Sequence, residues 1–374
     1  MNHQTNPSKT LSRRIQPNPA AFFETVYQAF QNAEQAVGSS IDRYYSIDGH
    51  TIRLRFAGPA LVDDLTPALE HHATPPTSAP ALTICIWDSM STQTEWPSFP
   101  WWEYFMHVNS NGEKVSNLYT PRGDIRGYND GRIYTHIGAD LFSILDIKQN
   151  IAVYWCQDAA QLPLYEKGAP VRTILHWWLR DKGLQLLHAG AIGTPDGAVL
   201  LAGKGGSGKS TTALTGLQSD LLYLSDDYSL VKLGSPPHVY SLYNTAKVRP
   251  DNLKRVPHLH HALTNANRLE TEKALFFIGQ HYPDKIVSDL PIRAILLPKV
   301  TGLPDTTIEP AGAKEALSSL ALSSLHQLAG SGKALIHTIN QLVNQVPIYH
   351  LKLGTELDQI PMVISDVIAR ESAP

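Results

Sequence analysis

The segment that most constrains the fold of this chain lies at residues 203–210, Gly-Lys-Gly-Gly-Ser-Gly-Lys-Ser. It fits the pattern G-x-x-x-x-G-K-[ST], in which glycines let the backbone take positive φ and approach an anion closely. Consecutive amide groups then form a concave cradle for phosphate. A short apolar run at 198–202 precedes the segment, and residues 209–217 can start a helix. Strand, glycine loop and helix is the order this motif requires, so we expect a phosphate-binding loop here.

The loop predicts which residues contact a nucleotide. Lys209 would reach the β- and γ-phosphates, and the Ser210 hydroxyl would hold Mg²⁺. The expected cofactors are Mg²⁺ and either ATP or GTP, because the loop binds phosphates and no base-reading motif is evident. The candidate nucleotide-binding residues are Gly203, Lys204, Gly205, Gly206, Ser207, Gly208, Lys209, Ser210 and Thr211.

Two adjacent carboxylates follow the loop unusually closely. Asp226 and Asp227 end an apolar run at 221–225, and Asp226 comes only 17 positions after Lys209. One short helix separates them from the loop, so we expect the acids beside it on a neighbouring strand. His188 lies 15 positions before Gly203, in an apolar segment at 186–193 that we expect to be a strand pairing nearby.

These three features together resemble the catalytic domain of HPr kinase/phosphorylase, which is related to the nucleotide-binding half of phosphoenolpyruvate carboxykinase. The resemblance covers about residues 165–300. It implies that Asp226 is the general base that takes the proton from a serine hydroxyl and that Asp227 helps to hold Mg²⁺. It also implies that His188 lies near the site of phosphoryl transfer. The two acids could exchange roles, since the sequence does not fix the assignment.

One part of the family pattern is absent. HPr kinases carry a second signature, with a glutamate and an arginine in a glycine-rich stretch, and the corresponding residues 243–251 lack it. Lys247 and Arg249 lie two apart in this segment and either neutralise the transferring phosphate, with Arg249 a candidate catalytic residue, or are solvated cations. The closer resemblance is to HPr-kinase-related proteins, some of which phosphorylate a serine of ribosomally made peptide precursors.

Composition narrows the class of protein. The 374 residues carry a net charge of −3, which gives no electrostatic case for nucleic acid or an anionic membrane as partner. Cys85 and Cys156 have no C-x-x-C spacing, which is typical of a reducing cytoplasm. No signal peptide or membrane span is evident. We therefore expect a globular cytoplasmic protein with no membrane partner.

The chain is long enough for two domains. We expect a mainly β (α+β) N-terminal domain at 1–165 with a role in substrate recognition, and an α/β kinase domain with a helical C-terminal tail at 166–374. A helix at 170–182 marks the boundary, and the aromatic segment at 96–105 is expected to be a loop packed on a core. Asp130-Gly131 predicts a hairpin turn, and the histidines at 258–261 favour a surface loop over a metal site. Further helices are expected at 19–30, 311–345 and 362–369, and further strands at 51–56, 82–87, 151–155 and 292–300.

The function that these features favour is an ATP- and Mg²⁺-dependent kinase that phosphorylates a serine or similar hydroxyl of a peptide or protein. The alternatives are a small-molecule kinase, a phosphoenolpyruvate carboxykinase-like enzyme, and a nucleotide-binding switch without transfer activity. Relatives with this catalytic domain often assemble as hexamers, so a homo-oligomer is also expected.

Overall fold

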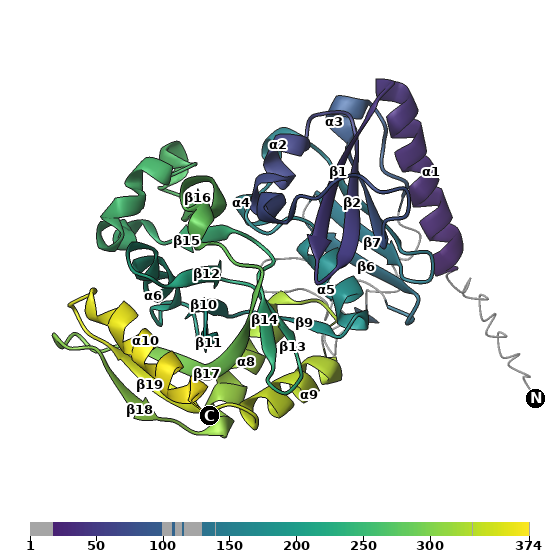
Figure 1. Cartoon of the computed structure of the whole chain (residues 1–374). Helices are drawn as coiled ribbons and strands as arrows, with labels where there is room; N and C mark the ends of the chain where they lie inside the picture. Colours follow the sequence, from purple (N-terminus) through teal and green to yellow (C-terminus); the bar gives the residue numbers. More distant parts are fainter. Residues whose placement is uncertain are drawn as a thin grey trace, which may run out of the picture.

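The protein has a mixed α/β fold built on two large sheets (Figure 1). The computed structural model describes residues 18–98, 107–108, 114–115, 129–138, 140–330 and 332–373. Across these ranges, no helix combines the length and the apolar character needed to cross a bilayer. The six-stranded sheet is formed by residues before 165 and the nine-stranded sheet by residues after 183.

The first sheet has the strand order β1-β2-β3-β8-β7-β6. β2 alternates as its sequence predicts, because Ile52, Leu54 and Phe56 are buried while Arg53 and Arg55 are half-buried. The β2–β3 and β3–β8 pairs are parallel and the other pairs antiparallel. The strands are β1 (Ser40–Ile47), β2 (His50–Ala57), β3 (Leu82–Asp88), β6 (Ile133–Gly138), β7 (Leu141–Asp146) and β8 (Ile151–Cys156); a separate pair is β4 (His107–Val108) with β5 (Lys114–Val115).

Helix α1 (Pro19–Val37) covers one face of this sheet. The Asn18 side chain caps its first turn by accepting a hydrogen bond from the Ala21 amide, and Gly38 in left-handed conformation ends it. The opposite face meets α5 (Arg172–Asp181) and the short helices α2 (Val62–Leu65) and η1 (Pro67–His72). The remaining short helices of this half are α3 (Ser89–Thr92), η3 (Ala159–Gln161) and α4 (Leu164–Lys167).

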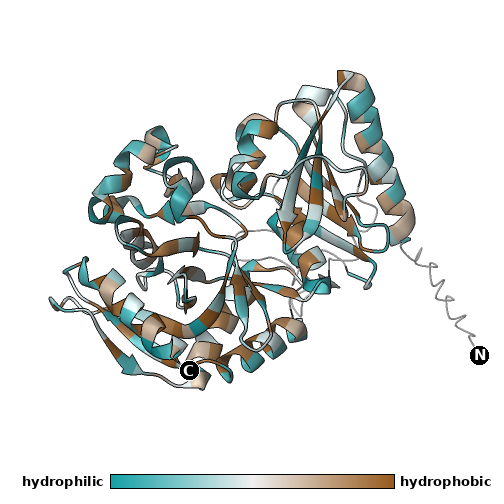
Figure 2. Ribbon diagram, viewed as in Figure 1, coloured by the Kyte–Doolittle hydropathy of each residue, from teal (hydrophilic) through white to brown (hydrophobic). Residues whose placement is uncertain are grey.

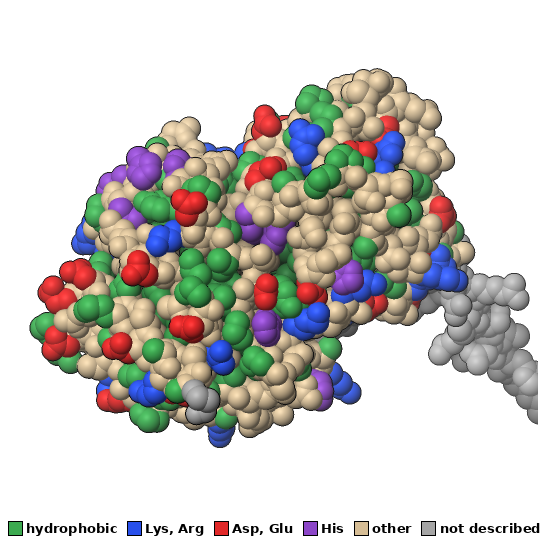
Figure 3. Space-filling view, viewed as in Figure 1, with side chains coloured by type: hydrophobic (Ala, Val, Ile, Leu, Met, Phe, Trp, Pro, Cys, Tyr) green, Lys and Arg blue, Asp and Glu red, His purple; other side chains and the backbone are tan. Residues whose placement is uncertain are grey.

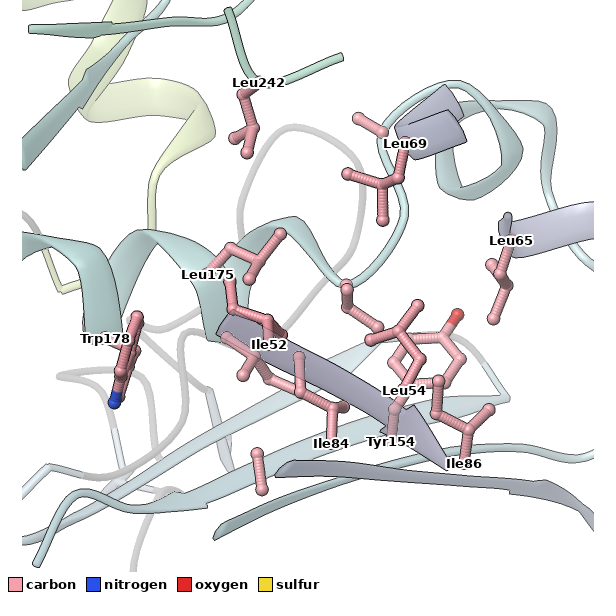
Figure 4. Close-up of a cluster of buried hydrophobic side chains, with 14 of the residues drawn as sticks. Ile52, Leu54, Leu65, Leu69, Ile84, Ile86, Tyr154, Leu175, Trp178 and Leu242 are labelled. Atoms are coloured by element: carbon pink, nitrogen blue, oxygen red, sulfur yellow. The ribbon is translucent and has the colours of Figure 1, made fainter. Parts of the chain in front are cut away.

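One hydrophobic core joins the first sheet to the second. Ile52 of the first sheet lies beside Leu175 of α5, and Tyr154 lies near Leu65 at the other end of the same cluster (Figure 4). The same cluster continues into Leu184, Leu186 and Leu230 of the second sheet. The brown strand interiors of Figure 2 show the apolar faces that these layers bury. A boundary between two domains near 165 therefore stays a prediction, because buried side chains from both sides share one core.

The second sheet has the order β12-β10-β11-β17-β14-β13-β9, with β19 added to β17 and β18 to β19. The long strand β17 pairs in parallel with β11 and β19 and antiparallel with β14. The strands are β9 (Leu184–Leu187), β10 (Gly190–Thr194), β11 (Gly197–Leu201), β12 (Leu222–Ser225), β13 (Ser229–Lys232), β14 (His238–Tyr240), β17 (Asp289–Val300), β18 (Thr307–Pro310) and β19 (Ile348–Leu353); β15 (Thr245–Val248) and β16 (Ala274–Phe277) form a separate hairpin-like pair.

Helices cover both faces of this sheet. On one face lie α6 (Lys209–Thr215) and α10 (Gln359–Ser372), and on the other α8 (Ala313–Gln327) and α9 (Gly332–Val343). Helix α10 contacts β10, β11, β17 and α6, so the C-terminal segment packs on the sheet of its own chain. The short elements are η4 (Gly216–Gln218), η5 (Pro250–Arg255), η6 (Pro257–Ala262), η7 (Ala266–Arg268), α7 (Ile278–His281) and η8 (Pro283–Lys285).

Most predicted elements are present with shifted ends. α1 and α10 extend beyond the predicted 19–30 and 362–369, and α5 starts at Arg172 because Val171 has a positive φ of 45°. The segment around Asp130-Gly131 forms a turn, with Gly131 at φ 88°, that leads into β6. Of the aromatic segment 96–105, residues 99–105 lie outside the described part. Trp96 packs on the core, with its ring 5.8 Å from that of Trp87.

The segment 186–193, which we predicted to be one strand, is two. The chain leaves the sheet at His188 and Ala189, between β9 and β10. The partner segment breaks at the same level, because β12 pairs with β10 while β13 pairs with β9. The acid pair lies in this second break, at 226–227. The two breaks face each other, and this opening in the sheet creates the space for a polar site.

Candidate functional site

The glycine loop lies between β11 and α6, as the sequence predicts. Gly206 and Gly208 have φ of 83° and 109°, conformations that residues with a Cβ rarely adopt. A Cβ on Gly208 would also come too close to Leu353 Cδ1, so that side chain would have to shift. Lys209 folds back over the loop, and its Nζ donates a hydrogen bond to the Gly203 carbonyl at 2.7 Å. Burial lowers the pKa of Lys209, while Asp227 and Asp226 oppose that change.

Asp227 lines a cavity beside the loop, and its carboxylate contacts the side chains of Lys247 and His188. Its Oδ2 is 2.8 Å from Lys247 Nζ and its Oδ1 is 3.0 Å from His188 Nε2. The Lys247 and His188 side chains are each 9% exposed and that of Asp227 is 22% exposed. Burial would raise the pKa of Asp227, but Lys247 and His188 outweigh it and hold that pKa well below its usual value. Asp227 is therefore an ionised carboxylate facing the cavity.

Asp226 has a different environment, although it is the adjacent residue. It is 1% exposed, and its Oδ2 accepts a hydrogen bond from the Lys247 amide at 2.9 Å. Burial, and then the charge of Asp227, raise the pKa of Asp226, while the Lys247 amide and the Ser210 hydroxyl oppose the rise. Its Oδ1 is buried and makes no hydrogen bond of normal geometry within the described residues. Such an oxygen is costly to bury unless a further partner binds there.

The strand arrangement differs from the prediction in one respect. We expected the acids on a strand next to that of the loop, but β10 lies between β11 and β12. The acids still reach the loop, because they follow the end of β12 in the break of the sheet. The acids are therefore close to the loop because of where the strands end, and not because their strands are paired.

Tyr228 holds the surroundings of the acid pair together. Its hydroxyl accepts a hydrogen bond from Arg172 at 2.7 Å and donates one to Gln327 at 2.5 Å. Its ring lies 5.7 Å from that of His188 and 5.6 Å from Lys247 Nζ. Through these contacts α5, α8 and β15 fix the two groups that bond Asp227.

A cavity of about 560 Å³ collects these groups. Its lining includes the loop residues, His188, Asp227 and Lys247. One side is apolar, with Val300, Leu353, Leu357 and Ile360. The remaining lining residues include Pro163, Leu164 and Tyr165 from the α4 region and Arg249, Asn252, Arg255 and Lys273 from the segment around β15 and β16.

Arg249 is placed differently from the other predicted site residues. Its side chain is 63% exposed at the cavity edge and lies 3.3 Å from Asp251. Lys247, two positions earlier, is the cation that the structure brings to the acid pair. Of the two, Lys247 therefore has direct contact with the candidate machinery, and Arg249 lies on its rim.

Among the described residues, no group of three or more His, Cys, Asp or Glu side chains is arranged to hold a metal. Residues 258–261 lie in η6, with His260 and His261 exposed; histidine side chains gather over that part of the surface in Figure 3. Mg²⁺ bound with a nucleotide needs only one or two carboxylates, since phosphates and water complete its shell. The open Oδ1 of Asp226 and the Ser210 hydroxyl fit such a site.

Several lining residues had no sequence signal. Arg255, Lys273 and Tyr165 lie in segments without a recognisable motif, and Leu353 is 150 positions after Gly203. Only the spacing of Lys247 and Arg249 pointed toward this part of the cavity lining.

Comparisons with known proteins add a distant structural similarity. No protein-family model and no curated protein matches the chain. Among solved structures, the HPr(Ser) kinase/phosphatase from Coxiella burnetii aligns over 50% of this chain and 95% of its own, with 10% sequence identity and a TM-score of 0.27. The likeness is too distant to assign a function, which rests on the geometry of the site.

Proposed function

We propose that this protein is an ATP- and Mg²⁺-dependent kinase that transfers the γ-phosphoryl group to a hydroxyl, with a serine of a peptide or protein as the first candidate acceptor. The observation that carries the proposal is the position of Asp227 in the same cavity as the glycine loop, Lys209 and Ser210. A phosphate cradle supports nucleotide binding. An ionised carboxylate facing it supports transfer to a hydroxyl, because it can orient the hydroxyl and accept its proton.

The apolar side of the cavity offers a surface for the nucleobase. Val300 is 48% exposed although it is a large apolar residue, and Leu353 and Leu357 extend this surface. The Leu353 side chain fills the space that a Cβ would take at Gly208, so this apolar surface directly adjoins the loop. Apolar walls beside a few polar groups are the usual composition of ligand sites.

We propose the reverse of the roles that the resemblance implied for the two acids, an exchange that the sequence left open. Asp227 lines the cavity and would be the base, while the buried Asp226, beside Ser210, would help to hold Mg²⁺. Bound there, Mg²⁺ would neutralise charge on the β- and γ-phosphates. Lys209 would contact the same phosphates once its bond to Gly203 is released.

The transfer itself is an in-line displacement. The acceptor oxygen forms the new bond to the γ-phosphorus as the bond to the β,γ-bridging oxygen breaks, and ADP leaves with that electron pair. The hydroxyl proton passes to Asp227. A carboxylate of low pKa suffices, since the loose transition state of phosphoryl transfer needs little bond formation to the nucleophile before the proton leaves. Lys247 and His188 keep Asp227 ionised and oriented.

The test is transfer of label from γ-³²P-ATP with Mg²⁺ to serine peptides and to small hydroxyl compounds. Lys209→Ala should lose nucleotide binding, and Asp227→Asn should retain it while transfer falls by about a hundredfold or more. Asp220→Asn is the matched control, because Asp220 is an exposed acid on the segment between α6 and β12. Tight nucleotide binding without transfer to any acceptor would instead support a nucleotide-binding switch. Absence of nucleotide binding would refute the proposal.

A further inference from the structure

Outside the glycine loop, two cations in the cavity lining have no acidic partner among the described residues. Lys247 is neutralised by Asp227 at 2.8 Å, and Arg249 lies 3.3 Å from Asp251. The one other acid in the lining, Glu272, is paired with Arg268 at 2.9 Å. Arg255 and Lys273 remain, and neither makes an ion pair within the described ranges.

Both cations come from one segment of the fold. Arg255 ends η5 and Lys273 directly precedes β16, so both belong to the segment that flanks β15. Asn265 fixes the backbone at Lys273, because its Nδ2 donates to the Lys273 carbonyl at 2.9 Å. The apolar surface of Val300, Leu353 and Leu357 comes from β17, β19 and the segment before α10 instead. The nucleobase surface and the two free cations therefore come from different parts of the fold.

We infer that the hydroxyl acceptor carries an anionic group, a carboxylate or a phosphate, which Arg255 and Lys273 bind while its hydroxyl faces Asp227. The inference rests on the proposed kinase function and deepens it by naming the acceptor chemistry. An anionic group on the acceptor would give both cations a partner. Charged hydrogen bonds to a carboxylate or phosphate are stronger than neutral ones, and Arg can make two in parallel.

Two kinds of acceptor could carry such an anionic group, a free hydroxy acid and an acidic peptide. Matched pairs of probes distinguish between them. N-acetyl-L-serine, an anion, is compared with N-acetyl-L-serinamide, which is uncharged, and a short peptide with glutamates flanking its serine is compared with the same peptide carrying glutamines. Each probe is titrated into the protein saturated with Mg²⁺ and a non-hydrolysable ATP analogue, and binding is measured by calorimetry. The same probes are then tested for label transfer.

We expect at least one anionic probe to bind about tenfold more tightly than its neutral counterpart. The variants Arg255→Gln and Lys273→Gln should each reduce this preference several-fold while the affinity for the ATP analogue changes less than about twofold. Lys254→Gln is the control, because Lys254 is an exposed lysine on the same η5 segment outside the cavity lining and should change neither quantity.

Two results would overturn the inference. Equal binding of the charged and neutral members of both pairs would show that the acceptor needs no anion. Loss of affinity for the ATP analogue in Arg255→Gln and Lys273→Gln would assign these cations to the nucleotide. Either result leaves the kinase proposal standing, whereas failure of the unaltered protein to bind nucleotide would refute the kinase proposal itself.

Discussion

His176 offers a quantitative test of the core between the two sheets. It lies on α5, is fully buried, and neither ring nitrogen has a hydrogen-bond partner within the described residues. Burial, followed by the charges of Arg180 and Arg172, lowers its pKa from 6.5 to about 3. The folded protein therefore holds this ring neutral where the unfolded chain would protonate it.

The sign follows from proton linkage. Below pH 6.5 the unfolded chain takes up a proton at this position and the folded protein does not, so the free energy of unfolding falls as pH falls, until the folded pKa is reached. Between pH 6.5 and pH 5 the loss is about 2 kcal/mol, at about 1.4 kcal/mol for each pH unit. His176→Phe removes this loss. At pH 7.5 it also removes an unpaired polar group, so the variant should be about as stable as the unaltered protein.

The assay is urea unfolding at pH 7.5 and pH 5.0, followed by tryptophan fluorescence. Trp177 and Trp178 are buried neighbours of His176 and report on the same core. The drop in unfolding free energy between the two pH values should be about 2 kcal/mol smaller in His176→Phe than in the unaltered protein. His337→Phe, at an exposed position on α9, should leave the drop unchanged. An equal drop in His176→Phe would refute the reasoning that this ring is neutral in the fold.

Three further predictions concern the loop, the contact between the sheets and a buried acid. Gly208→Ala should weaken binding of a fluorescent ATP analogue by about tenfold or more, because Gly208 has a φ of 109° and a Cβ there would overlap Leu353. Gly205→Ala should bind the analogue nearly normally, since a Cβ at Gly205 would have no atom within 4 Å. Normal binding by Gly208→Ala would contradict this prediction. Asn244→Ala should lower the free energy of unfolding by about 1 kcal/mol, because it loses the 2.9 Å bond to the Pro67 carbonyl, and an unchanged urea midpoint would count against that role. Arg132→Met should lower the thermal midpoint at pH 7, because the buried Asp146 carboxylate loses its bonds to Arg132 at 2.6 and 3.0 Å. Burial would raise the pKa of Asp146, but the hydrogen bonds from Arg132 and Gln149 outweigh it, so the net pKa is lowered. The stabilisation is therefore present at neutral pH, and the difference in thermal midpoint between the two proteins should shrink as acid protonates the carboxylate. A difference that grows in acid would refute this prediction.

Local patterns made the centre of the site predictable. The glycine loop, the strand before it and the helix after it form a continuous segment whose chemistry is encoded in consecutive residues. The adjacent acids at 226–227 and the lysine at 247 also follow strand ends or strand spacing, and the structure brings Asp227, Lys247 and His188 together. The environment of each acid could not be predicted, because the partial exposure of Asp227 and the burial of Asp226 depend on which way the chain turns after β12.

The rest of the site depends on contacts between distant segments. The break between β9 and β10 gives no signal in the apolar run 186–193, since it appears only where the partner strand changes from β13 to β12. Arg255, Lys273 and Leu353 reach the cavity only through the packing of η5, β16 and β19. For Arg249 the sequence pattern was misleading. Its spacing from Lys247 suggested that both side chains share one face of a strand, but β15 ends at Val248 and the Arg249 side chain turns to solvent.

The core shared by the two sheets has a consequence for how this protein can be divided. His71 and His72 of η1 bond Ser241, and Tyr243 bonds the Pro170 carbonyl, so polar contacts reinforce the apolar ones directly before the strand of Lys247. A fragment cut near residue 165 would expose the apolar side of α5 and of β9 to water on one piece, and that of the first sheet on the other. Such surfaces promote aggregation, so the half that contains the glycine loop should be recovered in soluble form only when both halves are produced together.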